Sequence, residues 1–246
     1  MFEYKLDKYL LRLLDKNNPE ELVSLQKLRY NSLLKEFNKN LNDDGLDDDG
    51  YDEYTDSIIV IDTETNTICG TYRLATKETT KGHPFLTQEE FNIDEVIKAG
   101  SVLEIGRAVV KEEYRDGAVI ALLWAGILEY VKQHNIRFVL GTCSLQGTSP
   151  KAHHEVLNYL RENLVCKEYN MYATTNSFEF PHDERIAHIK ELPPLLRFYI
   201  KMGVEVSSNG YIDYSFNSCD VITMVDMTKA NQAFVNYYTR KLERCE

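Results

Sequence analysis

A glutamate lies within an apolar run of this sequence, at Glu104 in the segment 102–110. Burying a carboxylate costs free energy unless the group pairs with a cation or is used in a reaction. A carboxylate in this position is suited to act as a general base, which removes a proton from an attacking group. The alternative is a structural ion pair, because Arg107 lies three positions further on and Arg73 is a second available cation.

Three arginines, Arg29, Arg73 and Arg107, lie among apolar or aromatic neighbours and not in charged stretches. A buried guanidinium requires a carboxylate or phosphate partner. These arginines therefore either bind the carboxylate of a substrate or pair with acidic residues of the chain itself. The acidic candidates for such pairing are Asp49, Asp52 and Glu104.

Residues 43–56 form an acidic segment with eight Asp or Glu side chains in fourteen positions. The usual interpretation of such a run is a solvated, mobile loop. A calcium-binding loop does not fit. If Gly50 is aligned with the invariant glycine of that motif, Gly45 falls on the first ligand position and Asp56 on the position that requires a bidentate glutamate.

The histidines and cysteines provide no metal or nucleophile motif. His153 and His154 are sequence neighbours, so on a helix they point to different faces and cannot share one ion. Cys143 and Ser144 follow each other at the end of a predicted strand, but no histidine has the spacing of a partner base. The sequence therefore predicts no metal site, and Cys143 is interpreted as strand packing.

Bulk composition narrows the class of protein. The chain has 246 residues, is 43% hydrophobic and carries a net charge of -11, which argues against a nucleic-acid partner. Five scattered cysteines without a CxxC pair indicate a reducing compartment and exclude a disulfide framework. The longest apolar stretch, 117–128, is too short to span a membrane. A cytoplasmic protein, with at most peripheral contact to the inner face of the membrane, is expected.

Periodicity predicts a single α/β domain over residues 1–246. Its first part is N-terminal helices over about residues 1–40, the second of them opening near Pro19, followed by the acidic loop at about 42–56. A β-hairpin over 57–75 comes next, and strand 102–110, helix 117–133 and strand 138–145 then form a parallel crossover. Further helices are expected at 151–163 and 193–203, and a final strand at 219–225.

Three segments, taken in order, carry a resemblance to a known family. LRYNSLL from Leu28, with DDDGYDEY and GTYRL, is similar to the N-terminal half shared by acyl-homoserine-lactone synthases and the N-acyltransferases of ornithine and glycine lipid synthesis. LEIGRAVVKEEYRDGAVIALLWAGI and PPLLRFYIKMGVEV, with the later YIDYSFNSCDVITMV, resemble the aminolipid acyltransferases specifically. The implied fold is that of the GNAT acyltransferases, a mixed central sheet flanked by helices.

The resemblance also implies roles for particular residues. Glu104 would be the base for amine acylation, and Tyr199 would protonate the leaving thiolate, although by periodicity Tyr199 is equally a core aromatic residue on an amphipathic helix. Asp49 and Asp52 match the D-x-x-D pattern placed near a cationic acceptor. The residues expected to bind substrate are Arg29, Asp49, Asp52, Arg73 and Arg107. Those expected at the thioester and its pantetheine are Ala108, Val109, Val110, Arg115, Gly117 and Ser144.

The segment 114–119 departs from the pattern of the acetyl-CoA enzymes. Those enzymes open the central helix with two closely spaced glycines that cradle a pyrophosphate, whereas this chain has only Gly117, next to Asp116. The expected donor is therefore an acyl carrier protein rather than coenzyme A, with no bound cofactor and an amino acid such as ornithine or glycine as acceptor.

Three alternatives stay open at the level of the sequence. They are an acetyl-CoA-dependent acetyltransferase, a non-catalytic module that binds acyl thioesters or lipids, and a lactone synthase, for which no S-adenosylmethionine pocket can be identified.

Overall fold

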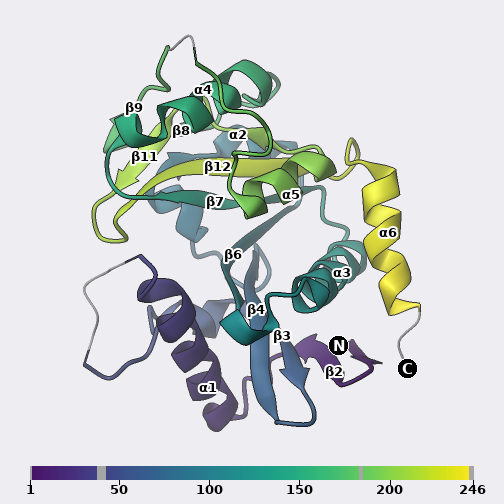
Figure 1. Ribbon diagram of the computed structural model, residues 1–246. Helices are drawn as coiled ribbons and strands as arrows, with labels where there is room; N and C mark the ends of the chain where they lie inside the picture. Colours follow the sequence, from purple (N-terminus) through teal and green to yellow (C-terminus); the bar gives the residue numbers. More distant parts are fainter. Residues whose placement is uncertain (1, 38–42, 183–184, 244–246) are drawn as a thin grey trace. The chain divides into compact units, whose positions relative to one another are not determined.

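The computed structural model of the protein describes residues 2–37, 43–182 and 185–243. The chain forms two compact units (Figure 1). The first unit takes residues up to 83, residues 105–135 and residues from 232 onward, and the second takes 84–104 and 136–231. Residues 1, 38–40 and 42, which belong to the predicted N-terminal helices and acidic loop, lie outside the described residues.

The first unit is built on a sheet with the strand order β1-β2-β3-β4-β6. Its strands are β1 (Glu3–Leu6), β2 (Tyr9–Leu13), β3 (Asp56–Asp62), β4 (Thr67–Thr76) and the later part of β6 (Val102–Val110). Its helices are α1 (Pro19–Arg29), the π-helix η1 (Tyr30–Leu34), the 3-10 helices η2 (Tyr51–Tyr54) and η4 (Glu112–Tyr114), α3 (Ala118–Gln133) and α6 (Gln232–Leu242). Gly126 lets α3 approach the sheet closely, because a Cβ there would lie 2.3 Å from the Ile58 side chain.

The prediction of two N-terminal helices is wrong for the first of them. Residues Glu3–Leu6 and Tyr9–Leu13 form a β-hairpin whose turn places Asp7 at a φ of 53°, and β2 pairs with β3. The leucine spacing fitted a helix, but pairing with β3 satisfies the backbone and buries Leu11 completely. Helix α1 begins at Pro19 as predicted, and the Asn18 side chain accepts a hydrogen bond from the Glu21 amide.

The second unit is built on the order β6-β7-β12-β11-β9, in which the first residues of β6 pair in parallel with β7. Its strands are β5 (Phe91–Asn92), β7 (Phe138–Gln146), β8 (Tyr172–Ala173), β9 (Ser177–Phe178), β10 (Glu205–Val206), β11 (Gly210–Asp213) and β12 (Ser218–Asp226). Its helices are the 3-10 helices η3 (Leu86–Glu89) and η5 (Pro150–His153), with α2 (Asp94–Ala99), α4 (His154–Asn163) and α5 (Pro194–Met202).

The core of the second unit forms where α4 and α5 pack on the sheet (Figure 1). Leu157 and Leu160 of α4 and Leu196 of α5 share one apolar cluster with Cys143 and Val221 of the strands. The predicted packing role of Cys143 is therefore confirmed. Along the described chain no helix has the length and apolar character that a bilayer crossing requires.

Most of the other predicted elements are confirmed. The hairpin corresponds to β3 and β4, the crossover to β6, α3 and β7, and the last predicted strand to β12. The predicted later helices correspond to α4 and α5. Helices α2 and α6 were not predicted, because α2 has only six residues and α6 buries only Leu242.

Candidate functional site

Arg29 occupies the interior of the first unit, with its side chain 1% exposed. It projects from the last turn of α1, and its two terminal nitrogens donate to Asp52 Oδ1 and Oδ2 at 2.8 and 2.7 Å. Its Nε lies 2.9 Å from Asp47 Oδ2. Two parallel charge-assisted bonds of this kind hold both partners in one plane. Of the two alternatives for Arg29, the structure therefore shows pairing with an acidic residue of the chain, Asp52.

Arg73 and Arg107 extend the same network. The terminal nitrogens of Arg73, on β4, donate to Asp49 at 2.6 and 2.8 Å and to Asp52 at 3.0 Å. Arg107, on β6, donates from Nε to Asp47 Oδ2 at 2.9 Å and from Nη2 to Asp49 Oδ2 at 2.8 Å. Three guanidinium groups and three carboxylates therefore form one charge-balanced cluster, which we call the ion-pair cluster.

The backbone of the acidic loop aims these carboxylates inward. Gly50 adopts a φ of 76° before η2, a conformation that disfavours side chains, and the Asp49 side chain accepts the amide of Tyr51. The amide of Asp47 donates to the Gln26 carbonyl of α1. The loop is thus folded by the cluster from residue 47 onward, and the predicted solvated loop does not describe this part.

Electrostatics within the cluster favour ionised aspartates. Burial alone would raise the pKa of Asp52, but the hydrogen bonds and charge of Arg29 outweigh that effect and hold the pKa well below its ordinary value. Burial would likewise raise the pKa of Asp49, but the hydrogen bonds and charge of Arg73 outweigh that effect, and the pKa of Asp49 is lowered. Arg107 adopts a φ of 49°, which is unusual for a residue with a side chain and often marks a functional position.

Glu104 belongs to the second unit and is 8% exposed. Its Oε2 accepts the Leu86 amide at 3.0 Å and its Oε1 the Thr87 amide at 2.6 Å. These are the first two amides of η3, which have no partner within the helix. Each carboxylate oxygen can accept a further hydrogen bond beyond these. Leu86 and Thr87 were not identified from the sequence, because their backbone amides carry the interaction.

Tyr199, also in the second unit, lies on α5 and is 6% exposed. The helix ends soon after it, at Gly203, whose φ of 96° suits glycine, and the Tyr199 carbonyl accepts the Val204 amide. Burial of the ring agrees with core packing and leaves the role of the hydroxyl to experiment.

The residues expected at the donor are divided between the two units. Ala108, Val109 and Val110 lie on β6 and Arg115 and Gly117 lie before α3, all in the first unit, whereas Ser144 lies on β7 in the second.

At the opening of α3 one backbone amide is already bound by a side chain of the protein. Gly117 has a φ of 99° at the N-cap, and the Asp116 carboxylate accepts the Ala118 amide at 2.9 Å. Arg115 donates to Glu36 at 2.6 Å and to the Val110 carbonyl at 2.9 Å. An acidic side chain thus occupies the place where a pyrophosphate would need amide donors.

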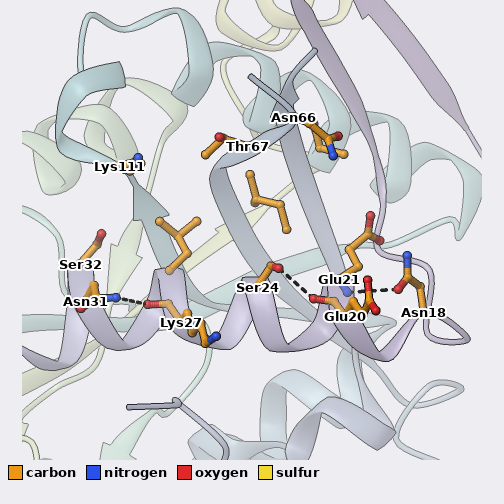
Figure 2. Close-up of a pocket in the computed structure, with 13 residues that line it drawn as sticks. Asn18, Glu20, Glu21, Ser24, Lys27, Asn31, Ser32, Asn66, Thr67 and Lys111 are labelled. Carbon is orange, nitrogen blue, oxygen red and sulfur yellow. Dashed lines mark hydrogen bonds between the residues drawn. The ribbon is translucent and has the colours of Figure 1, made fainter. Parts of the chain in front are cut away.

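A groove in the first unit lies apart from these candidates (Figure 2). It has a volume of about 490 Å³ and runs between α1 and the β3–β4 hairpin. Ser24 and Lys27 of α1 and Asn31 of η1 line one side, with Thr67 and Lys111 opposite. None of the residues to which the sequence assigned a catalytic or binding role lines this groove.

A second group of acidic residues, in the second unit, was not identified from the sequence. Glu90, Asp213 and Asp220 lie within 4.8 Å of one another through one carboxylate oxygen each, in an arrangement that could hold a metal ion. Glu90 lies far from Asp213 and Asp220 along the chain, so no local motif signals the group.

Comparisons with known proteins agree with this fold. A family profile described as an acetyltransferase (GNAT) domain matches residues 28–125. A solved CoA-dependent acyl-homoserine lactone synthase, BjaI with SAM and isopentyl-CoA, aligns with a TM-score of 0.55 at 15% identity, covering 95% of this chain and 89% of the other. An N-acyl amino acid synthase from uncultured soil microbes aligns with a TM-score of 0.51 at 9% identity, covering 90% and 93%. The chain therefore has the GNAT fold and is an acyltransferase.

Relatives identified by sequence similarity carry a narrower description than the GNAT domain. The L-ornithine N(alpha)-acyltransferase of Agrobacterium fabrum is 27% identical, over 92% of this chain and 84% of that protein. The enzyme of the same name from Rhizobium meliloti is 28% identical, over 89% of this chain and 80% of that protein. The resemblance to the aminolipid N-acyltransferases that the three sequence segments indicated is confirmed by these relatives.

Proposed function

We propose that this enzyme transfers a long acyl chain from a phosphopantetheine thioester to the α-amine of ornithine or a related amino acid, giving a lyso-aminolipid. The observation that carries this proposal is the similarity to L-ornithine N(alpha)-acyltransferases over about nine-tenths of the chain. Local motifs alone would support only the class of acyltransferase.

The reaction requires two proton transfers. The neutral amine nitrogen attacks the thioester carbonyl, the C–N bond forms and the C–S bond breaks. One proton leaves the nitrogen, and one proton is delivered to the departing sulfur. We assign the first transfer to Glu104, directly or through a water that it holds, and the second to the hydroxyl of Tyr199. Both side chains belong to the second unit and are largely buried, which suits groups that act away from bulk water.

The ion-pair cluster is proposed to act on the acceptor. Among its members Asp49 and Arg107 are the most exposed, at 23% and 17% of their side chains, whereas Arg29 and Asp52 are enclosed. An amino acid offers a carboxylate and an ammonium group, and these match a guanidinium and a carboxylate side by side. In this proposal Asp49 and Arg107 contact the acceptor. Arg29, Arg73 and Asp52 hold these two side chains in position.

The donor is proposed to be acyl carrier protein. Coenzyme A carries a pyrophosphate that GNAT enzymes commonly hold on backbone amides, and here Asp116 accepts the Ala118 amide at the opening of α3. A carrier protein presents a pantetheine with a single phosphate and does not depend on that cradle. Ala108, Val109 and Val110, consecutive on β6 in the first unit, are proposed to line the thioester and its pantetheine arm.

Acyl transfer measured on the purified chain tests the proposed function. We expect long-chain acyl carrier protein and ornithine to give a product with the mass of the N-acyl amino acid, and lipids extracted from overexpressing cells to contain the same compound. Transfer from acetyl-CoA alone would support the acetyltransferase alternative. Binding of the thioester without any amide product would support the non-catalytic alternative.

We further propose that the enzyme works in the cytoplasm and contacts the inner face of the membrane only peripherally. A product with one acyl chain and a polar head partitions reversibly into a membrane surface. Cosedimentation with vesicles should therefore be weak for the protein alone, because its net charge is -11. Tight, product-independent binding to vesicles would contradict this.

A further inference from the structure

The three carboxylates of the second acidic group come from separate elements of the second unit. Glu90 follows η3 directly, Asp213 ends β11, and Asp220 lies near the start of β12. One oxygen of each lies within 4.8 Å of the others. We call this group the carboxylate triad.

Each member of the triad is held in place by its surroundings. Asp213 Oδ1 accepts the Ser215 hydroxyl and the Phe216 amide, both at 2.7 Å. Asp220 stands opposite Tyr211 and Ser144 on the neighbouring strands. The Glu90 carbonyl accepts the Thr174 amide at 2.9 Å, which ties the end of η3 to the segment before β9. The approach of the three carboxylates is thus built into the fold of this unit.

Two carboxylate oxygens of the triad are buried and have no hydrogen-bond partner. The Asp220 side chain belongs to a residue that is 3% exposed, and its Oδ1 is buried without a hydrogen-bond partner. Glu90 Oε2 is likewise buried without a partner. A buried polar atom without a partner costs free energy, and more so when the group carries charge. Both oxygens belong to carboxylates that meet in the triad, where a bound cation or a proton would satisfy them.

The charge of the triad is also uncompensated. In the ion-pair cluster every aspartate has a guanidinium beside it, whereas no Lys, Arg or His of the described residues forms an ion pair with Glu90, Asp213 or Asp220. Carboxylates packed together in this way repel each other when ionised, and either a proton or a bound cation removes that repulsion.

We propose that Glu90, Asp213 and Asp220 bind a divalent cation of the hard, oxygen-preferring class, such as Ca²⁺, Mg²⁺ or Mn²⁺. Oxygen-only ligand sets select such ions, whereas zinc prefers nitrogen and sulfur. Two oxygens bound to one Ca²⁺ at about 2.4 Å lie at most about 4.8 Å apart, and the triad oxygens lie within that limit. Water molecules would complete the coordination.

The burial of one oxygen each of Asp220 and Glu90 favours an ion over a substrate ammonium group. Asp220 Oδ1 and Glu90 Oε2 are not reached by solvent. A substrate must enter and leave in every turnover, but a structural ion needs to enter only once. The positive charge is therefore assigned to a resident ion.

The ion would connect two functional parts of the second unit. Glu90 directly follows η3, and the first two amides of η3 hold the Glu104 carboxylate. An ion shared by Glu90, Asp213 and Asp220 would join the end of η3 to β11 and β12. The triad residues are then positioning residues for Glu104. Their binding of a metal can be measured without any assumption about the proposed acyl transfer.

Metal binding by the full chain, stripped by a chelator and dialysed, tests the proposal. We expect Mn²⁺, followed by its electron paramagnetic resonance signal, to bind at one site per chain and to be displaced by Ca²⁺ or Mg²⁺. Asp220→Asn and Glu90→Gln should each weaken that binding more than about 10-fold, since even changes to groups that only support the metal ligands cost about 10- to 100-fold. Glu89→Gln, an exposed neighbour with the same change of charge, should bind as the unaltered chain does.

Thermal unfolding supplies the second measurement. Added Ca²⁺ or Mn²⁺ should raise the Tm of the unaltered chain and of Glu89→Gln but not that of Asp220→Asn or Glu90→Gln. If Asp220→Asn does not fold, Glu90→Gln decides alone. Absence of a one-to-one Mn²⁺ site at millimolar metal, or equal binding by the triad variants, would overturn the proposal. So would stabilisation by free ornithine and not by metal, which would identify the triad as an ammonium site.

Discussion

Arg73 holds Asp49 through both of its terminal nitrogens, at 2.6 and 2.8 Å, and so joins the acidic loop to β4. A planar guanidinium matches a carboxylate in this way, and lysine could not replace it with the same geometry. The sheet therefore fixes the position of the loop. A substitution of Arg73 or Asp49 should change the affinity of the loop for the group that it binds.

Replacing Asp49 by Asn should raise the KM for the amino-acid acceptor and leave the KM for the acyl donor nearly unchanged. An amide retains the shape of the carboxylate but not its charge, so Arg73 and Arg107 lose their shared anion. Asp52→Asn should act in the same direction with a greater loss of stability, because its partner Arg29 is enclosed. Glu53→Gln, an exposed neighbour in η2, serves as control. Steady-state kinetics that change only for the donor would contradict the assignment.

The ion-pair cluster should make the protein sensitive to acid. The folded chain holds the pKa of Asp52 and Asp49 below the value of about 3.9 for an unfolded aspartate. Since the unfolded state takes up protons first as pH falls, the stabilisation is fully present above about pH 4 and is lost as pH falls through the folded-state pKa. Urea unfolding between about pH 3 and 7 should show this decline. Asp52→Asn, although less stable throughout, should show a shallower slope.

Glu104→Gln should lower kcat by about 100- to 10,000-fold, the usual contribution of a positioned proton transfer. The glutamine oxygen can accept only one of the amides of Leu86 and Thr87, and its NH2 group would face the other, so the Tm should fall as well. If Glu104 serves only to cap η3, the Tm falls but kcat stays nearly normal. Measuring both quantities across about pH 6 to 9 distinguishes these outcomes, and a folded variant with normal turnover would end the proposal.

Tyr199→Phe should reduce kcat less than Glu104→Gln does, because water can also protonate a thiolate. The ring of Tyr199 is buried and phenylalanine keeps its packing, so stability should change little. The matched control is Phe198→Leu, a neighbour on α5. A loss of activity that accompanies a loss of Tm in both variants would indicate packing, and not proton donation, at this helix.

The preference of the enzyme for acyl carrier protein over acyl-CoA should depend on Asp116. In Asp116→Ala the Ala118 amide is released and a negative charge is removed from the opening of α3. Turnover with acyl-CoA should therefore rise relative to turnover with acyl carrier protein. The exposed Glu113→Gln, in η4 just before this turn, controls for charge alone. An unaltered chain that turns over acetyl-CoA as well as long-chain acyl carrier protein would refute the donor assignment.

Much of this protein is determined by short-range patterns in its sequence. Strands β3, β4, β6, β7 and β12 and helices α3, α4 and α5 follow from apolar periodicity and turn residues, which act over a few positions. The set of charged residues in apolar surroundings also comes from sequence alone, since an enclosed charge is costly wherever it is. The three segments that resemble the aminolipid acyltransferases are likewise recognisable from the order of their amino acids alone.

Only the tertiary structure decided which partners those charges take. Arg29 pairs with Asp52, 23 positions further along the chain, and Arg107 pairs with Asp47, 60 positions before it. Glu104 is held by backbone amides and not by a charged side chain. No local spacing in the sequence could identify these partners. The N-terminal hairpin depends in the same way on pairing with β3, which overrides a helical leucine pattern. The carboxylate triad joins Glu90 to residues of β11 and β12 far along the chain. Such contacts arise from how strands and loops meet in three dimensions, where energy depends on distance in space and not along the chain.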